Sequence, residues 1–326
     1  MTKPNPIYPG CSHSCSRRVL NGAFRLSPRP EVVQIVKYLA IHYAKKHDVP
    51  LLILVIMSNH LQKLLDDPLG LHPEFVRDFN SMVAKTLNQL HFGTNKGQFW
   101  DHEKPSIQRM LTPSTTLDKL LYAAVNPVVA GLEPHALAWP GYVFGPEMAG
   151  LVIHVKRPDI LSHRFPEEHK YRVPVPQDYG DKSPRHVRAH FRRELEKREK
   201  LEREKRGDRP FAGQKAARKL THIEVPFYPP PDHDGELCKP RFAGPLHLIA
   251  EAADARADFR RKHADCLRRL QAGEVDITWP SGTFAQVFRF GATRAPSPDR
   301  SFSQRHHRTP ARRCTQIIFF YDSATT

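Results

Sequence analysis

The chain has 326 residues, a length that fits one large domain or two modest ones. Hydrophobic residues make up 40% of it, enough for a buried core, while 30 prolines and a mean hydropathy of −0.53 indicate segments outside that core. The longest apolar run, LLILVIM at 51–57, is too short to cross a bilayer, which excludes a transmembrane helix there.

The positive charge is large and unevenly distributed. Residues 1–150 hold 15 Lys+Arg against 11 Asp+Glu, a net of +4, whereas the rest of the chain holds 35 against 23, a net of +12. The total of +16 and an isoelectric point of about 9.8 favour a polyanionic partner. The shortness of the apolar runs favours no membrane partner. Since the N-terminal MTKPNPIYPG has no apolar signal-peptide core, we predict a cytoplasmic, reduced protein.

The cysteines give little sign of a structural framework. There are five of them, an odd number scattered along the chain, which does not suggest paired disulfides. Cys11, His13 and Cys15 could form half of a zinc site, but no second pair at ligand spacing follows. We therefore expect no structural zinc.

The first 150 residues alternate between strand-like and helical patterns. Apolar residues recur at helical spacing over 31–47 and 73–92, and these stretches flank a continuous apolar run over 51–59 that is typical of a buried strand. Residues 60–68 continue as a second strand, and 98–111 could be a strand or hairpin.

A third helix completes this part of the chain. It is predicted over 114–125, with a Ser/Thr start and an end imposed by Asn126-Pro127. The resulting order is strand, helix, two strands, helix, strand, helix. It predicts an α+β fold, a ferredoxin-like sandwich of a small antiparallel sheet with helices on one face, within a domain at 1–150.

The chain changes character after residue 150, where we predict a basic, mainly helical extension over 151–295. Residues 182–219 carry 15 Lys+Arg and 6 Asp+Glu, which indicates a solvated helix or a helix lying along phosphates. A second amphipathic helix is predicted over 245–274, followed by a hairpin turning at 280–282. The Pro/Ser/Arg-rich 296–326 is expected to be a disordered tail.

His60 and Gln62 stand two places apart on the second predicted strand. Side chains at this spacing point to the same face of a sheet, with Leu61 turned the other way. Two histidines so placed could bind a divalent metal ion, and a carboxamide in place of one keeps an oxygen donor but binds less strongly. A single histidine after a strand is more often a hydrogen-bonded structural residue.

Tyr122 and Asn126 lie four residues apart on the third predicted helix, one turn from each other. A phenol can attack a phosphodiester and hold it as a phosphotyrosine, which splits strand transfer into two reversible steps. A metal ion that polarises the phosphate would assist this attack. By spacing alone, however, Tyr122 reads as a core aromatic on an amphipathic helix.

Taken in order, four segments resemble the HUH-type single-tyrosine transposases, in particular the REP-associated tyrosine transposases and their insertion-sequence relatives. They are MSNHLQKLL, the FW of QFWDHE, YAAVNPVVAGL and WPGY, and the likeness spans about residues 10–145. Family members read roughly M-x-N-H-x-H-x-L-L and Y-I-x-x-N-P-V-x-A-G-L. The joint occurrence of these motifs is specific, although neither would be so alone.

The resemblance implies a role for each matching residue. His60 would be the first metal ligand, Gln62 takes the place of the second histidine, and Asn126 would be a third ligand or position the metal. Tyr122 would be the nucleophile that becomes joined to a DNA 5′-phosphate. The family implies one Mg²⁺ or Mn²⁺, here weakened by Gln62, a single-stranded or hairpin DNA substrate, and a homodimer.

Two functional readings remain open. One is a metal-dependent DNA strand transferase acting in transposition of mobile or repeat elements. The other is a decayed relative that only binds DNA, because Gln62 departs from the family motif at a metal ligand. An RNA-binding relative is disfavoured, since no stretch matches the aromatic RNA-binding signature.

Overall fold

A computed structural model describes residues 4–225 and 240–295 of the chain. Its strands are β1 (Cys11–Arg18), β2 (Leu51–Ile56), β3 (His60–Asp67), β4 (Ser106–Met110), β5 (Tyr142–Phe144), β6 (Val152–Lys156), β7 (Glu168–Arg172) and β8 (Phe242–Ala243). Its α-helices are α1 (Pro30–His47), α2 (His72–Phe92), α3 (Pro113–Val129), α4 (Pro184–Arg206), α5 (Gly213–Lys219) and α6 (Leu246–Gln271). Within these residues, no helix combines the length and the apolar character needed to cross a membrane.

The main sheet has six strands in the order β5-β2-β3-β1-β4-β8. All neighbouring strands run antiparallel except β4 and β8, which are parallel, so the sheet is mixed. Strands β6 and β7 form a separate two-stranded sheet. The fold is therefore α+β, as the alternation of strand and helix patterns predicted.

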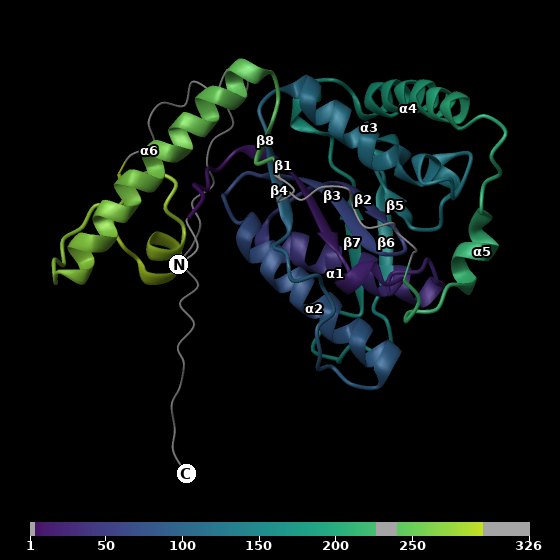
Figure 1. The fold of residues 1–326 in the computed structure, drawn as a ribbon, viewed down its shortest axis with the longest axis horizontal. Coiled ribbons are helices and arrows are strands. Elements are labelled where there is room, and N and C mark those ends of the chain that lie inside the picture. The colour runs from purple at the N-terminus through teal and green to yellow at the C-terminus, as the bar shows by residue number, and fades with distance from the viewer. Residues whose placement is uncertain (1–3, 226–239, 296–326) are drawn as a thin grey trace, which may run out of the picture.

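Helices cover both faces of the main sheet, as Figure 1 shows with α1 and α2 below it and α3 and α4 above it. All six residues of β2 are buried, because alternate side chains enter two different cores. Leu54 and Ile56 pack in the cluster that contains residues of α1 and α2, whereas Ile53 and Val55 pack with residues of α3 and α4. The expectation of helices on one face was wrong, since an unbroken apolar strand needs a cover on each side.

Most elements predicted for the first 150 residues are present with ends within a few positions. The helix that was expected to stop at Asn126-Pro127 instead continues to Val129. A proline costs a helix one backbone hydrogen bond, but Pro127 lies in the last turn. The amides of Ala130 and Leu132 bond to the carbonyls of Asn126 and Pro127, both at 2.9 Å, and close the helix end.

The hairpin expected at 280–282 was also wrong. The chain forms a single π-helical turn at Ala285–Arg289, in which Phe284 and Phe288 stack with ring centroids 4.9 Å apart. Their spacing of four residues matches a helical turn. Trp279 forms an isolated parallel bridge with Arg294 rather than the antiparallel pairing of a hairpin. The predicted helix just before it is confirmed as α6.

The residues after 150 share cores with those before it. Phe191 and Leu195 of α4 are buried in one hydrophobic cluster with Leu120 and Leu121 of α3. Tyr171 of β7 is buried with the α1 residues of the other cluster. The boundary placed at 150, with a domain at 1–150 and an extension at 151–295, stays a prediction. The tail predicted at 296–326 lies outside the described residues.

The WPGY segment fixes the end of β2 next to the turn that leads into β3. The buried Trp139 indole donates to the carbonyl of Ile56 at 2.8 Å. The Ile56 amide in turn donates to the Gly141 carbonyl at 2.7 Å. A Cβ at Gly141 would lie 2.0 Å from the Ile56 oxygen, so only glycine allows this approach. The motif thereby holds the strand that precedes His60.

Candidate active site

His60 opens β3 directly after a tight turn at 57–59. The Met57 amide donates to the His60 carbonyl at 2.9 Å, and His60 Nδ1 lies 2.8 Å from Asn59 Oδ1. Burial, together with the neighbouring charge of Arg18, lowers the pKa of His60 to about 4. His60 is therefore a neutral imidazole at pH 7.

The structure brings the three predicted metal ligands together. His60 Nε2 lies 3.1 Å from the side-chain nitrogen of Asn126 on α3 and 3.4 Å from that of Gln62. Because His60 and Gln62 share a sheet face and α3 packs over that face, a residue 66 positions away along the chain reaches the same imidazole.

Asn59 determines which nitrogen of His60 can act as a ligand. Its oxygen is an acceptor, so His60 Nδ1 carries the proton and Nε2 presents a lone pair toward Gln62 and Asn126. The Gln62 Oε1 atom is buried without a hydrogen-bond partner among the described residues. If both side-chain amides rotated by 180°, the oxygens of Gln62 and Asn126 would take the place of their nitrogens beside the lone pair of His60 Nε2.

This donor set fits a small divalent ion. One imidazole nitrogen and two carboxamide oxygens suit Mn²⁺, and the oxygens also suit Mg²⁺, which binds mainly oxygen and water. All three donors are neutral, so such a site lacks the charge of a carboxylate ligand and would bind weakly. Water and phosphate oxygens would complete the coordination.

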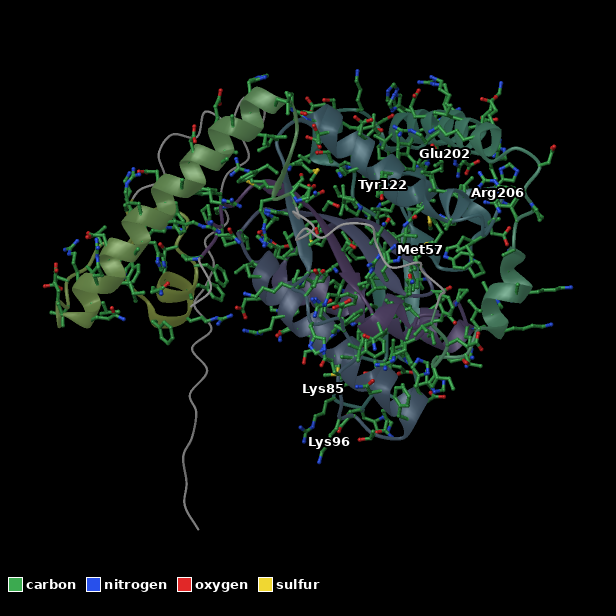
Figure 2. All side chains as sticks on the ribbon, in the orientation of Figure 1. Met57, Lys85, Lys96, Tyr122, Glu202 and Arg206 are labelled. Atoms are coloured by element: carbon green, nitrogen blue, oxygen red, sulfur yellow. The ribbon has the colours of Figure 1, made fainter. Side chains whose placement is uncertain are left out.

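Tyr122 lies on the exposed surface of α3, one turn before Asn126 (Figure 2). Its side chain is 55% exposed, so it is not the core aromatic that its spacing alone suggests. Lys119 Nζ lies 5.5 Å from the ring centroid, and within the described chain the hydroxyl makes no hydrogen bond. The phenol is therefore accessible to a macromolecular substrate.

Two polar neighbours of this site were not found from the sequence. Asn59, which orients His60, stands inside the quoted MSNHLQKLL motif, so its position was available as a signal. Arg18 lies directly opposite His60 in the β1–β3 register and is exposed. Only strand pairing reveals that second neighbour, because nothing in the local sequence links residues 18 and 60.

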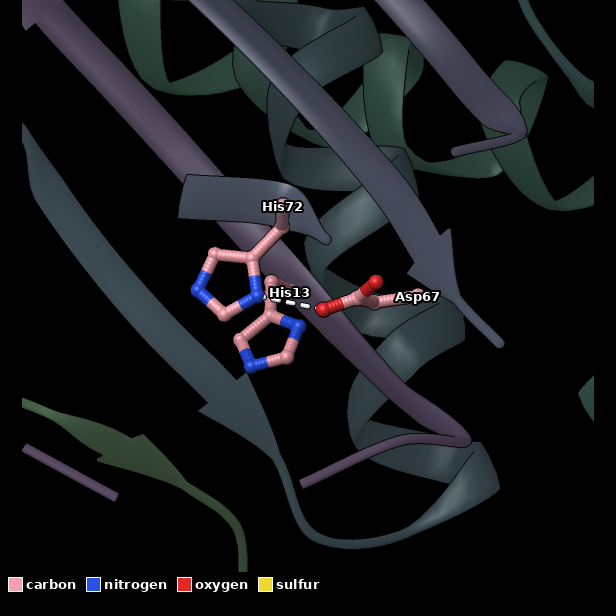
Figure 3. Close-up of side chains that lie close together, drawn as sticks. All are labelled: His13, Asp67 and His72. Atoms are coloured by element: carbon pink, nitrogen blue, oxygen red, sulfur yellow. Dashed lines mark hydrogen bonds and ion pairs between the residues drawn. The ribbon is translucent and has the colours of Figure 1, made fainter. Parts of the chain in front are cut away.

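A second cluster of ligand-type side chains lies on the other face of the sheet. His13, Asp67 and His72 are all buried, and their nearest ligand atoms lie within 4.8 Å of one another. Figure 3 shows the His72 ring directed at Asp67, with His72 Nδ1 2.5 Å from Asp67 Oδ2. Two imidazoles and a carboxylate form a group that could hold a metal ion.

Asp67 and His72 of this cluster are paired without an ion, whereas His13 Nδ1 has no hydrogen-bond partner among the described residues. The rings of His13 and His72 stack with centroids 4.1 Å apart, and Asp67 accepts a second hydrogen bond from the Leu71 amide at 2.7 Å. Burial, with the nearby His72 and Arg109 adding to it, lowers the pKa of His13 well below its usual value. The sequence offered His13 only as half of a zinc site, and its partners here are not the cysteines.

Comparisons with known proteins give low overall similarity. No protein-family model and no curated protein matches the sequence. The solved structures that resemble parts of it include a REP-associated tyrosine transposase bound to a REP hairpin (TM-score 0.37, 12% identity, 44% of this chain and 82% of that one) and a protein of Deinococcus radiodurans R1 described as a transposase (TM-score 0.26, 16% identity, 33% of this chain and 84% of that one). At these TM-scores, neither likeness carries the argument for fold or site.

Proposed function

We propose that this protein is a metal-dependent transposase-like enzyme that cleaves and rejoins single-stranded DNA through a phosphotyrosine intermediate. The observation that carries the proposal is that His60 Nε2, with its tautomer fixed by Asn59, faces Gln62 and Asn126 one helical turn from the exposed Tyr122. His60, Asn126 and Tyr122 match the HUH-type motifs, and Gln62 stands where those motifs have their second histidine. His60 and Asn126 are 66 residues apart in the sequence, and this separation alone did not require their side chains to meet in the fold.

The strand order supports the finer fold assignment within this proposal. Strands β2-β3-β1-β4 lie side by side in that order, with α1 between β1 and β2 and α2 between β3 and β4. This is the βαββαβ connectivity of a ferredoxin-like unit. Helices α3 and α4 are additions that cover its second face, and α3 supplies Tyr122 and Asn126.

The reaction follows from the nucleophile and its neighbours. Tyr122 Oη attacks the phosphorus of a phosphodiester, the bond from phosphorus to the 3′-oxygen breaks, and the 5′-phosphate becomes joined to the tyrosine. The phenol gives up its proton and the departing 3′-oxygen takes one. Attack by a 3′-hydroxyl on the phosphotyrosine reverses these changes and reseals a strand. Arg18, exposed beside His60, would bind a phosphate of the strand.

His60, Gln62 and Asn126 would hold one Mg²⁺ or Mn²⁺, which polarises the phosphate and stabilises negative charge on it. Gln62 weakens this site relative to a second histidine, because an amide oxygen is a poorer ligand than an imidazole. Activity is therefore expected to need a high metal concentration, with Mn²⁺ more effective than Mg²⁺.

The test is the formation of a covalent protein–DNA adduct. Single-stranded hairpin oligonucleotides from the DNA flanking the gene, labelled at the 3′ end, would be incubated with protein and either metal, and adducts separated under denaturing conditions. We expect a metal-dependent band with wild type and with Tyr179→Phe, a matched substitution at a tyrosine whose hydroxyl lies 3.0 Å from His190 Nδ1, but none with Tyr122→Phe. The absence of any adduct with wild type in both metals would reject the enzymatic proposal.

A DNA-binding protein without cleavage activity is the second candidate, and one observation favours it. The amide nitrogens of Gln62 and Asn126 both face His60 Nε2, which satisfies its lone pair without a metal ion. This candidate predicts salt-dependent binding of hairpin DNA that is unchanged by a chelator and by Tyr122→Phe. Binding that does not weaken with salt would count against both candidates.

A further inference from the structure

A cavity of about 830 Å³ lies between the β4–β8 edge of the main sheet and α6. It opens on the face of the sheet away from Gln62. His13 lines it and pairs directly with Leu65, and residues 62 and 65 of β3 point to opposite faces. The cavity is thus separate from the proposed active site. Its α6 and β8 walls lie outside the 10–145 region of motif resemblance.

The rim of this cavity is strongly cationic. Arg77 lines the cavity but pairs with Glu74 and Asp78. The other basic side chains of the lining are Arg17, Lys104, Arg109, Arg241, Arg256 and Arg260. Within the described ranges, no carboxylate lies at ion-pair distance from Lys104, Arg109, Arg241 or Arg256. Burial lowers the pKa of Arg260, and repulsion from Arg256 and Arg241 lowers it further. Glu251 is the one acidic side chain among the described lining residues, so positive charge is in excess and would attract an anion.

The floor of the cavity is apolar and partly aromatic. Tyr8 and Phe242 line it, and each ring carries a guanidinium above it: Arg109 lies 5.6 Å from the Tyr8 centroid and Arg256 lies 5.6 Å from that of Phe242. Free phosphate needs no such floor, whereas a nucleobase stacks on aromatic rings and on guanidinium planes.

The inner wall offers ring nitrogens for hydrogen bonding. His13 lies there with its Nδ1 atom buried and unpartnered among the described residues. His72 also lines the cavity and uses Nδ1 for its contact with Asp67, which leaves Nε2 as its remaining ring nitrogen. Ring nitrogens of this kind can pair with the polar edge of a base.

We propose that this cavity binds an unpaired nucleotide of single-stranded DNA, with the base over Tyr8 and Phe242 and its phosphates on Arg241, Arg256 and Arg109. Its size is that of sites for small ligands, so it admits an unpaired nucleotide rather than a duplex. The choice of DNA as the source of the nucleotide rests on the proposed function. The protein then contacts its strand on two opposite faces of the sheet.

The test compares two double variants that remove the same charge. Arg241→Ala with Arg256→Ala alters the cavity. Arg261→Ala with Arg268→Ala removes two arginines of α6 that pair with Asp258 and Asp265. Binding of a fluorescent short oligothymidylate would be measured by anisotropy in chelator, with Tyr122→Phe in every protein so that cleavage cannot contribute.

We expect the cavity variant to raise Kd about tenfold or more and to reduce the slope of log Kd against log salt by about 1.4, which corresponds to two phosphate contacts. The α6 control should change Kd less than about threefold, since an exposed ion pair contributes little. Equal losses in the two variants would mean that net charge alone matters and would overturn the inference.

Competition experiments identify the ligand. Thymidine 5′-monophosphate should displace the oligonucleotide at concentrations where inorganic phosphate does not, and equal competition by phosphate would overturn the base-binding part. Saturable binding of the mononucleotide without binding of the oligonucleotide would overturn the assignment to DNA. These measurements need no catalysis, so a failure of adduct formation and a failure of this inference remain distinguishable.

Discussion

The Nε2 atom of His60 and the side-chain nitrogen of Asn126 lie 3.1 Å apart although 66 residues separate them in the chain. This contact joins the first residue of β3 to the last turn of α3, the helix that carries Tyr122. A substitution on either element therefore changes the surroundings of the other.

Replacing Gln62 by histidine should strengthen metal binding. A second imidazole on the same face as His60 supplies a better nitrogen ligand for Mn²⁺ than an amide oxygen, and we expect Kd for Mn²⁺ to fall about tenfold or more. Calorimetric titration with Mn²⁺ measures it. Gln108→His is the control, because it makes the same change on the same sheet face in β4, beside Ser14. Equal affinity in both variants would contradict the site.

Removing the Asn59 side chain should loosen metal binding without unfolding the protein. Asn59 Oδ1 holds the proton on His60 Nδ1, and partners of this kind typically affect metal affinity by about 10–100-fold. We expect Asn59→Ala to raise Kd for Mn²⁺ about tenfold and to shift the side-chain nitrogen resonances of His60. Ser58→Ala, in the same turn, should leave both measurements as in wild type.

Acidification should destabilise the protein partly through His42. Its ring nitrogen lies 3.1 Å from that of His169, and burial first, then His169 and the charges of Lys46, His47 and Lys45, lower the pKa of His42 to about 4. Because the unfolded chain keeps the usual pKa of about 6.5, stability is lost as pH falls from 6.5 toward 4.

Exchanging His42 for glutamine should reduce this acid sensitivity. The side chain is partly exposed, so we expect a change of only about 0.5–1 kcal/mol in the stability difference between pH 7 and pH 5. Urea unfolding at the two pH values measures it. His102→Gln, at an exposed histidine, should keep the wild-type difference, and an identical effect in the two variants would refute the role of His42.

Glu199 should be the most sensitive polar residue of α4. Its buried carboxylate accepts from the Ala136 amide at 2.7 Å and lies 3.2 Å from His135 Nδ1 and 3.4 Å from Arg203. Glu199→Ala leaves a buried donor unpaired, which we expect to cost about 2–3 kcal/mol in urea unfolding. Glu196→Ala, at an exposed position on the same helix, should cost less than about 0.5 kcal/mol.

The Glu199 result also bears on the boundary placed at residue 150. If α4 belonged to an independent extension, losing its contact with residues 135 and 136 would leave the unfolding of the first 150 residues unchanged. The shared packing of Phe191 with Leu120 predicts instead a single transition that moves as a whole.

Local patterns were sufficient for the first half of the fold. The helix at 31–47 and the two strands at 51–67 follow from apolar spacing and turn residues, and all three are present. The pairing of strands is a long-range property, so the nearness of Arg18 to His60 could not be read from spacing. The second helical layer, formed by α3 and α4, could not be read from spacing either. The unbroken apolar run of β2 was nevertheless consistent with helices on both faces of the sheet.

The candidate site residues show the same difference between what local sequence patterns predict and what depends on long-range contacts. Their identities came from motif likeness, and periodicity alone would have placed Tyr122 in the core, where it is not. The His13–Asp67–His72 cluster was missed because its members come from β1, β3 and the start of α2. These three residues come together only in the folded sheet, because local sequence patterns do not show which strands pair or which side chains share a face.

The short strand β8 limits how two copies of this chain could associate. It adds in parallel to β4, and the amides of Arg109 and Leu111 donate to the carbonyls of Arg241 and Ala243 at 2.9 and 3.0 Å. Those amides would otherwise be open to a strand from another molecule. A homodimer built by continuing one sheet into the next across β4 would first have to displace this segment. Self-association by sheet continuation across β4 is therefore disfavoured, and this margin of the sheet remains closed against unwanted polymerisation.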